Sequence, residues 1–274
     1  MNKLKNKFII ECIEIHQKLN FDKICYGKVH SIFKNVLNIK VNNRLISLLT
    51  NKFLKAPYSI ICEIDDFNKI DIERGEEVYL SNQKLEFSNI IIDLSKCNKY
   101  YLDKLPKITK TEILESNINL IRKYYIENHY FIYENLIYVE FEKKLDIVKK
   151  AFQDNNFKLV KEELSSFFGY GQGLTPTGDD IILGLYIGLN IFENKDIKKI
   201  IFNLIESNLT KTTDISIQMF EGAKENYYRM EYILFFNRLG MKNFTKDDLK
   251  IILNIGHSSG RDILRGILFS YDII

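Results

Sequence analysis

The sequence has no tryptophan, only three prolines and no long apolar run. The longest apolar stretch, Ile181 to Leu189, is far shorter than the ~20 residues of a membrane-spanning helix, so we expect no membrane association. Cysteines are also few, and they stand singly, without a Cys-x-x-Cys pair or a nearby pair of histidines: Cys12, Cys25, Cys62 and Cys97. This spacing argues against a disulfide framework and a structural zinc site, and it favours reduced cysteines in a cytoplasmic protein.

Neither sign of charge predominates in the chain. Lys and Arg number 39 and Asp and Glu 36, which leaves a net charge of +3 over 274 residues. A protein that binds the nucleic-acid backbone needs a basic field, so nucleic acid is not an expected partner. Glu11 and Glu14 interrupt the first apolar run, and no small-residue cleavage site follows, so the N-terminus does not resemble a signal peptide.

Glycine is scarce, with 13 residues in all, and it is unevenly distributed. Residues 1–168 hold only two glycines, Gly27 and Gly75. The window 169–188 holds six: Gly169, Gly171, Gly173, Gly178, Gly184 and Gly188. Because glycine is the residue that tolerates unusual backbone conformations, this concentration indicates a backbone requirement at that place.

The chain changes its hydrophobic period near Pro106. Before it, short β-prone runs are separated by turn residues, and a short helix is expected near Asn42–Thr50. After it, apolar residues recur at helical spacing. We therefore predict an α+β protein: a β-rich N-terminal domain, residues 1–106, built as a small antiparallel sheet or barrel, and an all-helical C-terminal domain, residues 107–274.

The predicted elements can be assigned to residue ranges. The clearest strands are Tyr58–Ile64, Glu77–Leu80, Lys84–Phe87 and Asn89–Leu94. Helix starts are indicated by Thr or Ser with an acidic residue soon after. The predicted helices are Thr111–Asn128, Leu136–Gln153, Asn156–Phe168, Thr177–Phe192, Asp196–Leu209, Asp214–Glu225, Glu231–Leu239, Thr245–Asn254 and Ser259–Tyr271.

The glycine-rich window fits neither of two familiar nucleotide loops. Its Gly-x-x-x-x-Gly spacing is that of a P-loop, but Asp179 and Asp180 stand where that loop needs Lys and Ser or Thr. Pro176 and the lack of a suitable preceding strand exclude the dinucleotide fingerprint. The remaining interpretation is a loop that enters a helix, with Thr177 as the N-cap and Asp180 as the capping-box acid.

The same pattern recurs 82 residues later, counted from Thr177 to Ser259. The segment Thr177–Leu185 (TGDDIILGL) aligns with Ser259–Ile267 (SGRDILRGI), so that cap, glycine, acid, apolar pair and second glycine match. Two helices with like N-termini, brought together, would form one cleft suited to an anion or a carbonyl-bearing substrate. The glycines inside these helices, Gly184, Gly188 and Gly266, favour close helix packing.

The alignment separates the acidic residues. Asp180 and Asp262 are equivalent, which favours helix capping for both, with substrate binding as the alternative. Asp179 is matched by Arg261 instead, so it is the better candidate for a catalytic, metal or proton-transfer role. His257, in the loop before the second helix, is the other candidate catalytic residue.

The other candidate substrate-binding groups are hydroxyls and backbone N–H groups of the two loops. In particular, the N–H groups of Gly178 and Gly260 are expected to hold a phosphate or carboxylate. Thr212–Ser216 is expected to cap a further helix, and a position of that helix facing the same cleft is the alternative. The full substrate-binding set is Gly171, Gly173, Thr175, Thr177, Gly178, Asp180, Ser258, Ser259, Gly260 and Asp262.

These motifs together resemble a known family. Gly171–Asp180 (GQGLTPTGDD) and Gly256–Asp262 (GHSSGRD) are similar to the bacterial AllH-like family, and so are Gly27–Phe33 and Ile91–Ser95. Arg261 departs from the uncharged or aromatic residue expected at its position. The family includes a subunit of the oxamate carbamoyltransferase of anaerobic allantoin breakdown, so the resemblance implies one subunit of a multi-subunit enzyme.

The reaction that the resemblance implies is carbamoyl transfer between oxalurate and phosphate, giving oxamate and carbamoyl phosphate. Its substrates are small anions, which suit paired helix N-termini, and its partners are further subunits. A second interpretation is a non-catalytic anion-binding or assembly subunit. A third is a metal-dependent hydrolase built on Asp179 and Asp180, so the cofactor stays open, with a divalent metal as the candidate.

Overall fold

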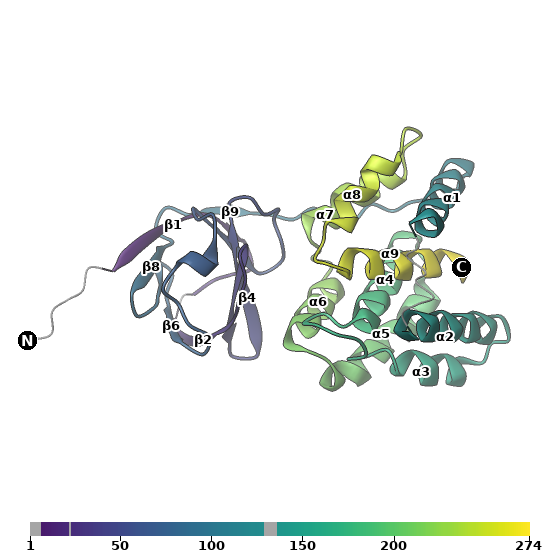
Figure 1. Cartoon of the computed structure of the whole chain (residues 1–274), viewed down its shortest axis with the longest axis horizontal. Coiled ribbons are helices and arrows are strands. Elements are labelled where there is room, and N and C mark those ends of the chain that lie inside the picture. The colour runs from purple at the N-terminus through teal and green to yellow at the C-terminus, as the bar shows by residue number, and fades with distance from the viewer. Residues whose placement is uncertain (1–6, 22, 129–135) are drawn as a thin grey trace, which may run out of the picture. The chain divides into compact units, whose positions relative to one another are not determined.

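The computed structural model describes residues 7–21, 23–128 and 136–274. The chain divides into two compact units, Met1–Asp103 and Lys104–Ile274. Among the described residues, the first unit contains strands and one short 3₁₀ turn, and the second contains helices only (Figure 1). The predicted fold class, a β-rich N-terminal part followed by a helical C-terminal part, is confirmed.

The first unit is a nine-stranded sheet in the order β5-β4-β3-β2-β6-β7-β8-β1-β9, closed by a further pairing between β5 and β1. Most neighbours are antiparallel, but β1 pairs parallel with β8 and β9, and β4 with β5. The buried core combines aliphatic side chains such as Leu37 and Ile39 with aromatic ones such as Phe67. The strands are β1 Phe8–His16, β2 Cys25–Ile32, β3 Val36–Val41, β4 Arg44–Thr50, β5 Ser59–Cys62, β6 Glu77–Leu80, β7 Lys84–Glu86, β8 Ile90–Asp93 and β9 Asn98–Tyr100.

The helix expected near Asn42–Thr50 is wrong, because this segment is a hairpin turn followed by β4. Asn42 and Asn43 have φ values of 51° and 62°, the left-handed conformation that two-residue hairpin turns require. Strand β4 buries side chains on both of its faces, so it lacks the alternation of a half-buried strand. A short apolar run of this kind cannot be told from a buried helix by its period.

The expectation of reduced cysteines is wrong for two of the four. Cys12 in β1 and Cys97, the residue before β9, form a disulfide, whereas Cys25 and Cys62 are free. The two bonded residues are 85 positions apart, and the parallel pairing of β9 with β1 brings them together. Spacing along the sequence does not reveal a pair that only the sheet makes adjacent.

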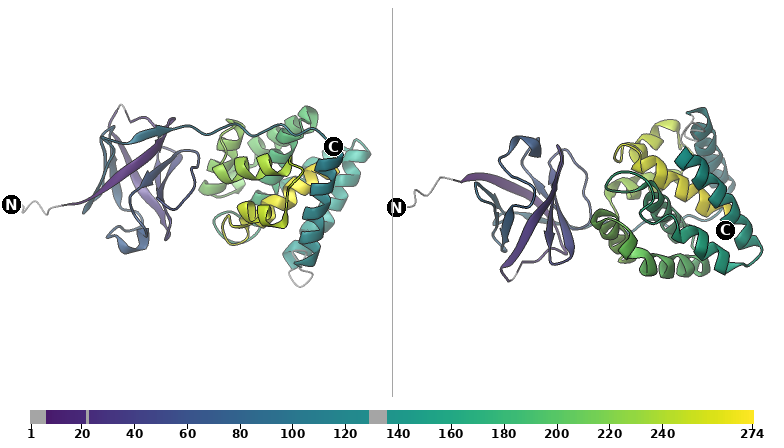
Figure 2. Two further views of the ribbon diagram at one scale, coloured as in Figure 1. Left: turned by 90° about the horizontal axis from the view of Figure 1, so that it is seen from above. Right: turned by 60° about the horizontal axis from the view of Figure 1, so that its bottom comes forward.

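The second unit is built around two helices, α4 and α9, which lie side by side within it (Figures 1 and 2). All residues of α4 are buried, which is why its sequence is apolar on every side. None of the described helices is both long and apolar enough to cross a membrane. The helices are α1 Glu112–Glu127, α2 Leu136–Gln153, α3 Phe157–Ser165, α4 Thr177–Ile191, α5 Lys195–Asn208, α6 Asp214–Lys224, α7 Met230–Leu239, α8 Leu249–Leu253 and α9 Ser259–Asp272.

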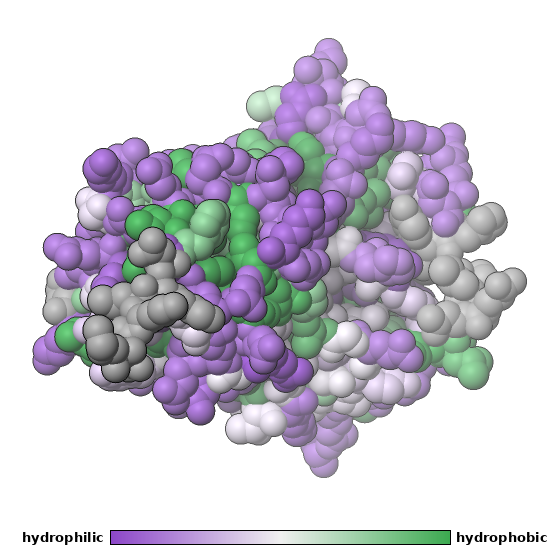
Figure 3. Space-filling view, turned by 60° about the vertical axis from the view of Figure 1, so that its left-hand side comes forward, coloured by the Kyte–Doolittle hydropathy of each residue, from purple (hydrophilic) through white to green (hydrophobic). Residues whose placement is uncertain are grey.

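The first unit carries an apolar groove of about 650 Å³. It is lined by the start of β1, where Phe8 and Ile9 are 63% and 61% exposed, and by acidic residues such as Glu63 and Asp66. Figure 3 shows hydrophobic surface on the face that this unit presents. The groove contains no residue of the glycine-rich motifs, so the candidate site lies in the helical unit.

Candidate functional site

Helices α4 and α9 run parallel and pack through the glycines that the two motifs share. An added Cβ on Gly184 of α4 would overlap the carbonyl oxygen of Ile263 in α9. Conversely, an added Cβ on Gly266 of α9 would overlap the carbonyl oxygen of Ile181 in α4. The two contacts are equivalent in the duplicated motif, since Gly184 and Gly266 are 82 positions apart and so are Ile181 and Ile263. Close helix packing, the predicted reason for these glycines, is confirmed.

The loops that precede the two helices meet at their ends. Thr175 Oγ1 and Ser259 Oγ lie 2.8 Å apart and share a hydrogen bond. The N–H of Gly178 donates to the Tyr170 carbonyl and the N–H of Gly260 to the Ile255 carbonyl, both at 2.9 Å. These two N–H groups, expected to bind an anion, are therefore already engaged in closing their loops.

The two loops differ in length by three residues. From Tyr170 to Gly178 the chain advances eight positions (178 − 170), and from Ile255 to Gly260 five (260 − 255). The additional residues lie in the glycine-rich stretch, where Gly171 and Gly173 have φ values of 124° and 93°. Such angles are open to glycine and strained for other residues, which explains the concentration of glycine in the sequence.

The capping roles predicted at the two helix starts are wrong. Helix α4 begins at Thr177 with Pro176 as its N-cap, and neither α4 nor α9 has a side-chain cap. Thr177 and Ser259 are the first helical residues and not the N-caps, so the acid lies one position too far along for a capping box. Instead the acids face the opposite helix. The Ser259 hydroxyl of α9 acts on Asp180, and the Thr177 hydroxyl of α4 acts on Asp262.

Asp180 is a buried carboxyl whose nearest hydroxyls, those of Ser259 and Thr175, do not reach hydrogen-bond geometry in the described parts of the chain. Its side chain is 1% exposed, and neither oxygen has a partner at hydrogen-bond geometry within the described parts of the chain. Burial raises its pKa well above the usual range, the hydroxyls of Ser259 and Thr175 lower it, and the charge of Asp262 raises it further. Burial therefore disfavours the charged form of the Asp180 carboxyl.

Asp262, the equivalent acid of α9, has partners. Arg261 Nε donates to it at 3.2 Å, and the Tyr138 hydroxyl donates to it at 3.1 Å. The Arg261 guanidinium also donates to the Tyr138 hydroxyl and lies 4.4 Å from the centre of that ring. Burial raises the pKa of Asp262 to about 6, against the lowering effect of Arg261. No sequence signal indicated Tyr138, which belongs to neither motif.

Asp179 links the glycine-rich loop to the segment before α6 through hydrogen bonds. It accepts hydrogen bonds from the Gly169 N–H, at 3.0 Å, and from the Thr212 hydroxyl. Thr213 caps α6, as predicted for this segment, and also donates to the Leu174 carbonyl at 2.6 Å. Burial raises the pKa of Asp179 above its ordinary value, and these bonds lower it in part.

His257 is exposed in the shorter loop, next to the half-buried Ser258. In the parts of the chain that the structure describes, no hydrogen bond joins His257 to Asp179. No group of three or more His, Cys, Asp or Glu side chains within residues 7–21, 23–128 and 136–274 is arranged to hold a metal ion. The catalytic roles of Asp179 and His257 therefore stay predictions.

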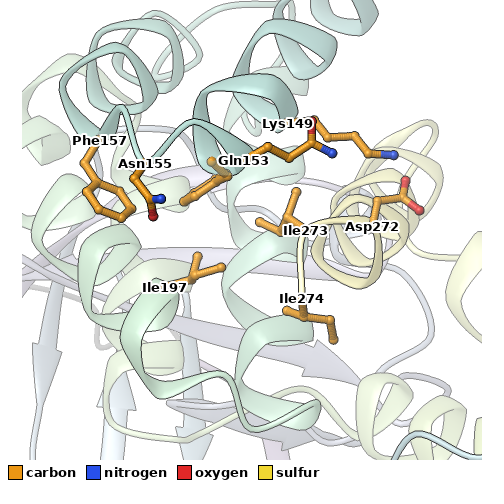
Figure 4. A pocket seen from close by; sticks show the side chains of 9 residues that line it. Lys149, Gln153, Asn155, Phe157, Ile197, Asp272, Ile273 and Ile274 are labelled. Carbon is orange, nitrogen blue, oxygen red and sulfur yellow. The ribbon is translucent and has the colours of Figure 1, made fainter.

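A separate hollow of about 350 Å³ lies at another part of the helical unit. Figure 4 shows its lining, with the side chains of Lys149 and Asp272 at one end and apolar side chains such as Ile197 and Phe157 at the other. It shares no residue with the two loops. The candidate site is therefore the junction of the loops, where the hydroxyls of Thr175 and Ser259 meet.

Fold and site define a two-part protein whose helical part carries a duplicated loop and helix around two parallel helix N-termini. Residues 167–271 match the family model described as oxamate carbamoyltransferase subunit AllH, and residues 7–99 match the AllH family N-terminal domain. The chain belongs to the AllH family. Both motifs lie within the first match, so the resemblance found in the sequence is confirmed. No solved structure matches the chain.

Proposed function

We propose that this chain, as a carbamoyltransferase subunit of the AllH family, binds the small anionic substrates of that enzyme at the junction of its two loops. The reaction is transfer of the carbamoyl group of oxalurate to phosphate. A phosphate oxygen bonds to the carbamoyl carbon, the carbon–nitrogen bond to oxamate breaks, and the proton of the phosphate passes to the oxamate nitrogen. The products are carbamoyl phosphate and oxamate.

The convergence of the two motifs supports this proposal most directly. Thr175 and Ser259 come from loops 84 residues apart and lie within hydrogen-bond distance of each other. Beside them, the positive ends of two parallel helices point the same way and favour negative charge. The N–H groups of Thr177 and Asp179 have no acceptor among the described residues, so they remain as donors for an anion.

Asp179 and His257 are the groups we assign to the proton transfer or to its orientation. A positioned acid or base contributes roughly 100-fold or more to such a step. We expect Asp179→Asn and His257→Ala each to lower turnover by about 100-fold when the chain is assayed with its partner subunits. Asp146→Asn, an exposed acid of α2, is the matched control and should keep wild-type turnover. Unchanged turnover in both variants would contradict the assigned roles.

A second candidate function is a non-catalytic binding or assembly subunit. The observation that favours it is that Asp179 already serves the structure of the glycine-rich loop. It predicts that the chain co-purifies with its partner subunits while calorimetry detects no binding of phosphate or oxamate. The cytoplasmic location expected from the sequence stays a prediction.

A further inference from the structure

Asp180 and Asp262 are equivalent in sequence but not in surroundings. Asp262 is paired with Arg261 and Tyr138, whereas both oxygens of Asp180 lack a hydrogen-bond partner in the described chain. The hydroxyl of Tyr232, 3% exposed, also lacks one, and it lies close enough to Asp180 for the charge of the acid to raise its pKa. Two buried polar groups without a hydrogen-bond partner among the described residues, Asp180 and Tyr232, therefore interact through the charge of the acid.

The charges around Asp180 oppose its ionisation. Those that act on it are the carboxylates of Asp262 from α9 and Asp179 from α4 itself, and both disfavour a further negative charge. From α7 the neighbour is the uncharged phenol of Tyr232. Asp180 is also almost completely buried, so water does not stabilise the charged form. Each of these effects favours the protonated acid.

The protonation state of Asp180 decides what the two hydroxyls above it can bind. A carboxylic acid donates its proton to a hydroxyl oxygen, and that hydroxyl then donates its own proton outward. A carboxylate does the reverse: it accepts from the hydroxyls and leaves their lone pairs facing outward. The two hydroxyls that act on Asp180, those of Ser259 and Thr175, are half-buried where the loops meet. If Asp180 is uncharged, a hydroxyl at the loop junction donates its proton outward, and the site therefore favours a negatively charged oxygen of a ligand.

We propose that Asp180 is a positioning residue that acts as an uncharged carboxylic acid. Its single proton is donated to the hydrogen-bonded pair of hydroxyls, Thr175 and Ser259, so that one of the two is oriented to donate a hydrogen bond to a carboxylate or phosphate oxygen of the substrate. This inference rests on the proposed function, since it assigns a recognition role within the same anion site. It also gives the two equivalent acids different tasks. Asp262 binds a guanidinium of its own chain, and Asp180 prepares the site for an external anion.

The test is oxamate binding by isothermal titration calorimetry to the full chain with its partner subunits. Oxamate keeps one negative charge between about pH 6 and about pH 9, a range in which buried carboxyls titrate. Asp180→Asn keeps an uncharged donor, so we expect its affinity at about pH 6 to lie within roughly threefold of the wild type. Asp180→Ala has no donor and should bind about tenfold more weakly, the effect of one hydrogen bond.

The pH profile supplies a second readout. Wild-type affinity should fall more steeply with rising pH than that of Asp180→Asn, because only the wild type can lose the Asp180 proton, whereas Asp262 titrates in both chains. Identical pH profiles for the two chains, or an Asp180→Asn affinity as low as that of Asp180→Ala in a chain with an unchanged circular dichroism spectrum, overturn the inference. Absence of oxamate and phosphate binding by the wild type at every pH overturns the proposed function instead.

Discussion

At the scale of single residues, equivalent positions in the duplicated motif have acquired different chemistry. Arg261 replaces the acid found at Asp179, and its guanidinium supplies the positive charge that stabilises Asp262. The matching acid in the first copy, Asp180, has two carboxylates as its charged neighbours. The sequence alignment treated Asp180 and Asp262 as equivalent and singled out Asp179, whose catalytic role stays a prediction. The difference in partners between Asp180 and Asp262 arises from packing and cannot be read from the sequence.

Asp262 makes the stability of the chain depend on pH. Its folded pKa of about 6 lies above the ordinary value of 3.8, so the folded state binds its proton more tightly. The resulting stabilisation is present below about pH 4 and is lost as the pH rises through about 6. Asn mimics the protonated acid and does not titrate. The free energy of unfolding of Asp262→Asn, taken relative to that of the wild type, should therefore rise by up to about 3 kcal/mol between pH 4 and pH 7.5.

Urea unfolding of both chains at the two pH values measures this difference. The exposed residue Asp146 provides the control, because Asp146→Asn should show a difference from the wild type that is the same at both values. A difference for Asp262→Asn that does not change with pH would contradict the origin assigned to the shift.

At the scale of elements, helices were predictable and strands were only partly so. Helix α2, Leu136–Gln153, has the bounds that its apolar period predicts, because one face is buried and the other exposed. Strand β4 was missed because it is buried on both faces, and β9 has only three residues. The duplication predicted that the two loops meet, as Thr175 and Ser259 do. The contacts of Tyr138 with Asp262 and of Thr212 with Asp179 depend on packing between segments that share no sequence pattern, so the sequence did not predict them.

The glycine contacts between α4 and α9 should control the stability of the helical unit. Gly184→Ala and Gly266→Ala each place a methyl group against backbone of the facing helix, which cannot move aside without separating the pair. We expect each substitution to destabilise the chain by at least about 2 kcal/mol, as overpacking of a core does. Differential scanning calorimetry should show this as a lower Tm.

Gly240→Ala is the matched control, since the added methyl would meet only Ile108, at 3.8 Å or more, in ordinary contact. Gly240 also has a negative φ of −79°, so alanine fits its backbone. Equal stability losses at Gly184 and Gly240 would show that the effect arises from the loss of glycine in general and not from the helix contact.

At the scale of the whole molecule, the chain divides into two compact units with different features. The helical unit contains both motifs, and the sheet contains the disulfide and the exposed groove beside β1. Each unit has its own buried core, so each should unfold as a unit of its own. The change of hydrophobic period near Pro106 predicted this division into two kinds of structure. The closure of the sheet depends on pairings between distant strands and had no local signal.

The disulfide should stabilise the first unit only. Linking Cys12 to Cys97 closes a loop of 85 residues, and such a link typically contributes about 2–4 kcal/mol by restricting the unfolded chain. Reduction of the disulfide, or Cys12→Ser, should therefore lower the unfolding temperature of the sheet unit in a calorimetric scan. The unfolding temperature of the helical unit should stay unchanged. Cys25→Ser, at a free cysteine, should change neither. An equal shift of both transitions would contradict independent unfolding.

The parallel pairing of α4 with α9 also has a consequence for synthesis of the chain. Helix α9 starts 82 residues after α4, which at about 5–20 residues per second means a delay of roughly 4–16 s on the ribosome. Throughout that interval the apolar surface of α4, buried on all sides in the finished protein, has no partner from α9. The nascent chain therefore carries an uncovered apolar face of α4 until α9 emerges, and this is a surface for chaperones to protect.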